Sequence, residues 1–142
     1  MINNKQVLDS MVETTRMGQT GIRAVLRCHL EPAMEQALRQ QLQEYDLLED
    51  EAQALADSRG WTLKRPHSML QHMIEKMTWM KLGRNNRQSK IADMMIQGNT
   101  QGMIHSLRDL HSYKGDDQRV RDLNQKLVYC EIENIRQMKS YL

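Results

Sequence analysis

Helix-breaking residues are scarce in this chain, which has two prolines and seven glycines in 142 residues. Strong helix formers, chiefly alanine, leucine, methionine, glutamine, glutamate, lysine and arginine, occupy most of the remaining positions. Apolar side chains recur at intervals of three and four residues, as they do along one face of an α-helix. The sequence therefore predicts an all-α fold, and its length suits a single domain over residues 1–142.

The spacing predicts four long helices and one short one, over residues 5–30, 32–57, 66–82, 87–113 and 117–142. Pro32 separates the first two, because proline disfavours helical backbone in the residue before it and suits the first turn of a new helix. The second helix should end at Gly60. Gly115 predicts a glycine stop before the last helix, with an aspartate cap at its start.

The lengths of the connections predict the topology. Few residues join the first two long helices, and few join the last two, so each pair should be antiparallel. Residues 58–86, which include the short helix, allow the second and third long helices to run parallel. This is the one-crossover arrangement of a four-helix bundle.

Charge and composition exclude several broad classes of protein. Twenty basic residues nearly balance eighteen acidic ones, so no overall basic field would attract nucleic acid. No apolar run is long enough to span a membrane, and residues 1–10 lack the apolar region of a secretory signal. Cys28 and Cys130 are too isolated to suggest a zinc site and are expected to be reduced thiols buried in helices. These features predict a cytoplasmic protein with no membrane partner.

The predicted apolar faces become polar or small near the midpoint of each long helix. The positions are Thr15, Gly18, Gln19, Gln41, Tyr45, Gly98, Asn99, Glu131 and Asn134. Buried polar groups need partners, so a hydrogen-bonded layer could form from Gln41, Tyr45, Asn99, Glu131 and Asn134. The alternative is that these residues lie at the edges of the apolar faces.

A row of methionines follows the short predicted helix, at Met69, Met73, Met77 and Met80. This spacing is typical of residues packed in a core. Methionine also suits adaptable protein-contact surfaces, and its thioether is a ligand for Cu(I). The sequence leaves these interpretations open.

Three stretches carry a resemblance to a known family: YDLLEDEAQALADSRGW at 45–61, MIQGNTQGMIHSL at 95–107 and EIENIRQMKSYL at 131–142. Together with the helix layout, they resemble the ferritin-like superfamily, and within it small bacterial proteins related to spore-coat protein F. The resemblance implies a ferritin-like four-helix bundle whose long crossover carries the short extra helix. It also implies a link to a bacterial spore or stress context.

Redox-active members of that superfamily bind two metal ions through a Glu on each of two helices and Glu-x-x-His on each of the other two. This chain contains no Glu-x-x-His, and its third long helix contains no Glu. In the last helix, Asn134 stands three residues after Glu131, where an amide replaces the imidazole. The sequence therefore predicts no metal cofactor and no catalytic residue.

The function predicted from these features is that of a non-catalytic structural or protein-interaction component, with protein partners or further copies of the same chain. One alternative is a degenerate metal-binding oxidoreductase that retains a metal through Glu131 and a nearby acid. Another is a binding module that uses the basic connector 81–90 on an acidic or nucleic-acid partner. This connector has four basic residues and no acid, but it lacks the aromatic residues that stack on bases.

Overall fold

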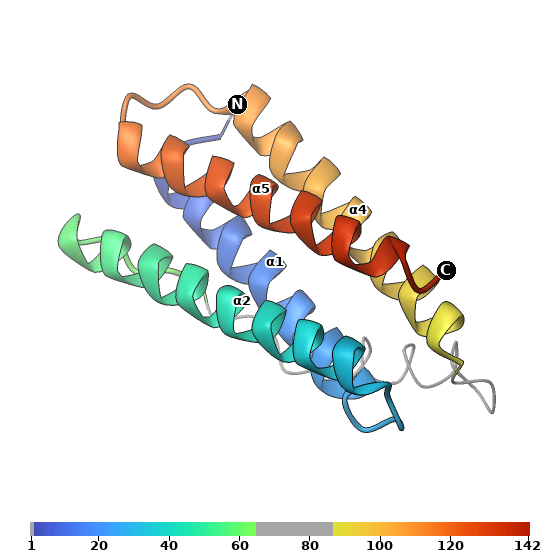
Figure 1. The fold of residues 1–142 in the computed structure, drawn as a ribbon. Coiled ribbons are helices and arrows are strands. Elements are labelled where there is room, and N and C mark those ends of the chain that lie inside the picture. Colours follow the sequence, from blue (N-terminus) through green and yellow to red (C-terminus); the bar gives the residue numbers. More distant parts are fainter. Residues whose placement is uncertain (1, 65–86) are drawn as a thin grey trace.

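The computed structural model describes residues 2–64 and 87–142, and the regular elements in these residues are all helices (Figure 1). They are α1 (Asn4–Val25), α2 (Pro32–Ser58), α4 (Gln88–Ser112) and α5 (Gln118–Lys139). The all-α prediction and its four long helices are thereby confirmed. The short helix predicted over 66–82 lies outside the described residues, as do Met69, Met73, Met77 and Met80 and most of the basic connector.

The helices form two antiparallel pairs, α1 with α2 and α4 with α5, and α1 lies beside α4 while α2 lies beside α5. Figure 1 shows α2 and α4 running in the same direction. Hydrogen bonds at their first turns agree with this. The backbone N–H of Glu31 donates to Gln88 Oε1 at 2.9 Å, and Gln88 Nε2 donates to the carbonyl of His29 at 3.3 Å. The second and third long helices therefore start at the same end of the bundle.

α1 ends at Val25, five residues before the predicted end. The N–H groups of Arg27 and Cys28 donate three residues back along the chain, at 3.3 and 3.0 Å, and so tighten the last turn. The following backbone groups bond to Gln88 instead of continuing the helix. The apolar spacing continues to Leu30 because Leu30 is buried in the core, even though it lies in the turn.

α4 ends one residue before its predicted end, but the predicted glycine stop does not end it. Among the described residues, Gly60, at the end of α2, is the only glycine with a positive φ, of +72°. Gly115 therefore does not act as a left-handed stop. Instead, Tyr113 adopts an extended conformation and forms a parallel bridge with Ile2. The predicted aspartate cap is present, because the Asp117 side chain accepts a hydrogen bond from a backbone N–H in the first turn of α5.

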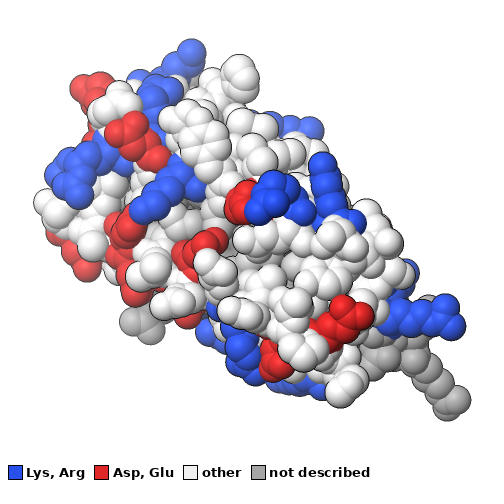
Figure 2. Space-filling model, viewed as in Figure 1, with Lys and Arg blue, Asp and Glu red and all other residues white. Residues whose placement is uncertain are grey.

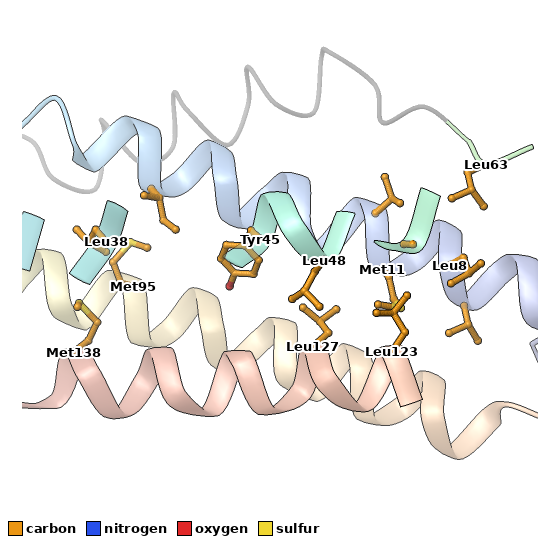
Figure 3. Close-up of a cluster of buried hydrophobic side chains, with 14 of the residues drawn as sticks. Leu8, Met11, Leu38, Tyr45, Leu48, Leu63, Met95, Leu123, Leu127 and Met138 are labelled. Atoms are coloured by element: carbon orange, nitrogen blue, oxygen red, sulfur yellow. The ribbon is translucent and has the colours of Figure 1, made fainter. Parts of the chain in front are cut away.

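The apolar faces of all four helices meet in one core (Figure 3). Full burial of one large apolar side chain, such as a leucine or methionine of this core, contributes about 1.5–3 kcal/mol to the stability of the fold. Figure 3 shows Tyr45 between two apolar groups. One group contains Leu38, Met95 and Met138, and the other contains Met11, Leu48 and Leu127. A polar layer therefore crosses the bundle about midway along its core.

The surface carries charges of both signs. Figure 2 shows acidic and basic side chains interspersed on one face, with uncharged residues between them. None of the helices in residues 2–64 and 87–142 combines the length and apolar character needed to cross a bilayer.

Candidate functional site

Four of the five predicted layer residues lie together in the interior. Tyr45 comes from α2, Asn99 from α4, and Glu131 and Asn134 from α5, and each is at most 5% exposed. They occupy positions on the buried face of their helices, in line with the apolar residues one turn away. The side chains join three helices at one level of the bundle.

The Tyr45 hydroxyl is the centre of this cluster. Its oxygen lies 2.8 Å from Glu131 Oε2 and 2.8 Å from Asn99 Oδ1. Asn134 Nδ2 donates to the Tyr45 oxygen at 3.3 Å and to Asn99 Oδ1 at 3.2 Å. Asn99 Nδ2 in turn donates to the carbonyl of Met95, one turn back on α4, at 2.8 Å.

Burial favours the uncharged form of this cluster. Burial raises the pKa of Glu131 to about 8, and the Tyr45 hydroxyl beside it lowers that pKa by less. Burial and the neighbouring Glu131 carboxyl raise the pKa of Tyr45 well above 10. A proton on Glu131 Oε2 can bond to the Tyr45 oxygen, which frees the Tyr45 hydrogen for Asn99. The geometry thus accommodates a neutral carboxylic acid.

The other predicted polar residues have separate partners. Gln41 is buried but donates to Gln137 Oε1 at 2.8 Å. Gln19 donates to Glu49 Oε2 at 2.8 Å, and the Thr15 hydroxyl bonds to the backbone of its own helix. Gln41 therefore stands apart from the cluster, and none of the polar side chains predicted on α1 joins it.

Glycines allow the close approaches around the cluster. A Cβ atom at Gly18 of α1 would lie 2.6 Å from Tyr45 Cε2, and one at Gly102 of α4 would lie 2.8 Å from Glu131 Oε1. Both distances are shorter than carbon atoms can tolerate without displacement. The Tyr45 ring and the Glu131 carboxyl therefore need glycine at these positions.

A cavity of about 870 Å³ lies between α1 and α4, with Tyr45 and Glu131 in its lining. Its walls include Gly18, Gly21, Gly98 and Gly102, which are inside helices and present no side chain. Sequence reasoning missed this cavity. The glycines themselves were the available signal of a cavity. A glycine inside a helix destabilises the fold by about 0.5–1 kcal/mol relative to alanine, so its presence there needs a reason.

The cluster does not match the two-metal site of the redox-active ferritin-like proteins. At this level α2 presents a phenol, α4 an amide, and α5 one carboxyl and one amide. Four carboxylates and two imidazoles form the metal-binding version. No group of three or more His, Cys, Asp or Glu side chains that could hold a metal ion occurs in the described residues.

Ser10, His105 and Asp109 form a small group outside the cluster, and its geometry differs from that of a catalytic triad. The Ser10 hydroxyl donates to Asp109 Oδ2 and lies 2.8 Å from His105 Nε2. Asp109 Oδ2 is 3.7 Å from that same ring nitrogen. In a triad the carboxylate holds the other ring nitrogen and the histidine accepts the serine proton. Here the serine proton points to the carboxylate instead.

The two thiols are free and half-buried. Cys130 lies on α5, whereas Cys28 lies in the turn after α1, so the prediction that both are buried in helices is wrong. Burial and the nearby Glu44 carboxyl raise the pKa of Cys130 to about 12, which keeps it in the unreactive thiol form.

Comparison with protein-family models, curated proteins and solved structures finds no match for this chain. The functional proposals below are accordingly built on the side chains just described and on the sequence resemblance.

Proposed function

We propose that this chain is a non-catalytic helical bundle, ferritin-like in its helix order, that acts as a structural or protein-interaction component. The observation that carries the proposal is the hydrogen-bonded cluster of Tyr45, Asn99, Glu131 and Asn134. It stands midway along the bundle, where the metal-binding proteins of the superfamily hold their ions. The link to a bacterial spore or stress context is part of the proposal and rests on the sequence motifs.

The cluster supports a structural role because its groups pair with one another. A carboxylic acid, a phenol and two amides share hydrogens across three helices, and their burial makes any misalignment costly. Sliding one helix by a turn would leave several of these groups unpaired. The cluster therefore favours one register of α2, α4 and α5, as buried polar residues do in some coiled coils.

Exposed apolar side chains on the outer surface support a role in protein contact. Tyr129 and Ile132 are 62% and 46% exposed and lie three residues apart on α5. Leu47, on the neighbouring α2, is 55% exposed. Tyrosine and other large apolar residues are enriched in the cores of protein interfaces, so this pair of helices offers a contact surface.

Metal analysis tests the non-catalytic part of the proposal. The protein would be purified from cells grown with added iron and manganese, and its metal content measured beside that of Glu131→Gln. We expect less than one metal ion per ten chains in both proteins. Stoichiometric iron or manganese that disappears in Glu131→Gln would favour the degenerate metal-binding oxidoreductase instead.

Sedimentation velocity tests the contact surface. The double variant Tyr129→Lys, Ile132→Lys should weaken self-association or partner binding while keeping the helical circular dichroism spectrum. Leu107→Lys, which places one lysine at a 38% exposed position on α4, is the control and is compared with the single variant Ile132→Lys. Equal effects of the two changes would argue against a specific surface on α5.

A further inference from the structure

The cavity between α1 and α4 has two glutamates in its described lining. The titratable side chains in its described lining are Glu13, Tyr45, His105 and Glu131, and no Lys or Arg occurs among the described lining residues. Glu13 and His105 are exposed, whereas Glu131 is 1% exposed. The cavity thus leads from solvent-exposed side chains to a buried carboxyl.

One oxygen of the Glu131 carboxyl faces Gly102 of α4, which has no side chain. Tyr45 bonds to Oε2, and Oε1 lies on the side of Gly102. With the proton shared between Oε2 and Tyr45, Oε1 is an acceptor in both the neutral and the ionised state. A group that reaches Oε1 from the cavity must therefore donate a hydrogen bond.

The rest of the cavity is suited to an apolar body. Met17 on α1 and Met94, Met95 and Ile96 on α4 line it, together with the glycine backbones. Methionine side chains adjust to ligands of different shape and contact aromatic rings favourably. At about 870 Å³, the volume falls in the range of small-molecule sites, about 300–1,000 Å³.

We propose that this cavity binds a small organic ammonium ion, a primary amine on an apolar body, with the ammonium group at Glu131 Oε1 and the body along the methionines. An ammonium group has three donors and no acceptor, which matches an oxygen that can only accept. The Tyr45 ring adds a π face for a cation. Among the described lining residues, an anion would meet two glutamates and no lysine or arginine. This inference is independent of the proposed structural role.

The binding should depend on pH, because the ammonium ion pairs best with the ionised carboxyl. Of the described titratable residues on the packed helices, Tyr45 of α2 bonds to this carboxyl, and Glu13 of α1 and His105 of α4 line the same cavity. On its own helix, Cys130 lies beside it and contacts Glu44 of α2. Burial raises the pKa of Glu131 to about 8, so its ionised fraction rises from about 1% at pH 6 to about 50% at pH 8. If the ammonium ion binds only the ionised carboxyl, affinity should rise about 50-fold over this interval, with release of about one proton at pH 6 and about half a proton at pH 8.

The test uses two primary amines, 2-phenylethylamine and 4-phenylbutylamine, which stay protonated between pH 6 and 8. The alcohols with the same carbon skeletons are the uncharged controls. Isothermal titration calorimetry in buffers of different ionisation enthalpy gives both the affinity and the proton release. We expect the amines to bind at least tenfold more tightly than the alcohols at pH 8, with the difference shrinking at pH 6.

Variants locate the binding. Glu131→Gln should abolish the pH dependence and weaken amine binding at least tenfold at pH 8. Gly98→Leu should block the cavity without touching the cluster, because a Cβ at Gly98 meets no atom within 4 Å. Glu13→Gln and His105→Gln test the two exposed titratable groups of the lining and should change affinity less than threefold.

Several results would overturn the proposal. Amines that bind no better than the alcohols would show that the site does not select a cation. Amine binding that is unchanged by Gly98→Leu would place the ligand elsewhere, and this variant decides the question even if Glu131→Gln fails to fold. If the pH dependence of amine binding disappears in His105→Gln but persists in Glu131→Gln, then His105 controls it instead of Glu131, and the proposal is wrong.

Discussion

Replacing Glu131 with glutamine should stabilise the folded protein at neutral and alkaline pH and change its stability little in weak acid. Glutamine has nearly the same shape, and its amide can donate to the Tyr45 oxygen as the neutral acid does. It cannot ionise, so it removes the cost of keeping a carboxyl group buried. The comparison therefore isolates the free energy associated with one proton.

The size of the effect follows from the pKa. The carboxyl ionises near its ordinary value of 4.5 in the unfolded chain and near 8 in the folded protein, where burial favours the neutral acid. Between these values folding takes up a proton, and each pH unit lowers the free energy of unfolding by about 1.4 kcal/mol. The wild type should therefore lose about 3 kcal/mol of stability between pH 4.5 and pH 7 and about 4 kcal/mol by pH 8, with little further loss above pH 9. Stability is greatest below the unfolded pKa and is lost as the pH rises through the folded one.

Urea unfolding followed by circular dichroism measures this difference at half-unit intervals from pH 5 to pH 9. The gap in unfolding free energy between Glu131→Gln and wild type should widen with pH and level off above pH 8. Glu133→Gln is the control, because exposed Glu133 pairs with Arg136, which lowers its pKa and gives a small effect of opposite sign. A gap that stays constant from pH 5 to pH 9 would refute a neutral Glu131 in the folded state.

The remaining predictions concern residues around the cluster. Gly18→Ala should destabilise the protein by about 1–3 kcal/mol, because its Cβ would lie 2.6 Å from the Tyr45 ring. Gly21→Ala, whose Cβ would have no atom within 4 Å, should stabilise the protein by up to about 1 kcal/mol. Thermal denaturation of the two variants measures this difference. Tyr45→Phe should cost about 1–3 kcal/mol in urea unfolding because it leaves the buried acid and amides without their shared hydroxyl, and an unchanged midpoint would contradict a structural cluster. With a pKa of about 12, Cys130 should react with a thiol reagent at pH 8 about a thousandfold more slowly than an ordinary thiol, which the Cys28→Ser variant measures; a fast reaction would show that the site opens.

Local signals in the sequence were sufficient to predict most of the helices. The period of apolar residues, Pro32 and Gly60 placed α2 within one residue at its C-terminal end. The end of α1 and the way in which α4 stops were less predictable, because remote residues determine them. Gln88 bonds to the turn after α1, and Ile2 pairs with Tyr113 after α4. No pattern within either helix reports such contacts.

The site was predictable to a similar degree. Polar residues on apolar helix faces identified Tyr45, Asn99, Glu131 and Asn134, since such residues must find partners inside the bundle. Gln41 satisfies the same criterion but lies one turn from Tyr45, close enough to Gln137 to bond there instead. The cavity could not be predicted, because it depends on how closely α1 approaches α4 and on side chains that glycine lacks.

The contact between Gly102 and the Glu131 carboxyl has a consequence for the evolution of this protein. Any side chain at position 102 would occupy space that the acid now fills, since its first carbon would fall 2.8 Å from Oε1. The two positions therefore share one volume. Homologous sequences with glutamate at 131 should keep glycine at 102, and lineages that acquire a larger residue at 102 should show a shorter one at 131.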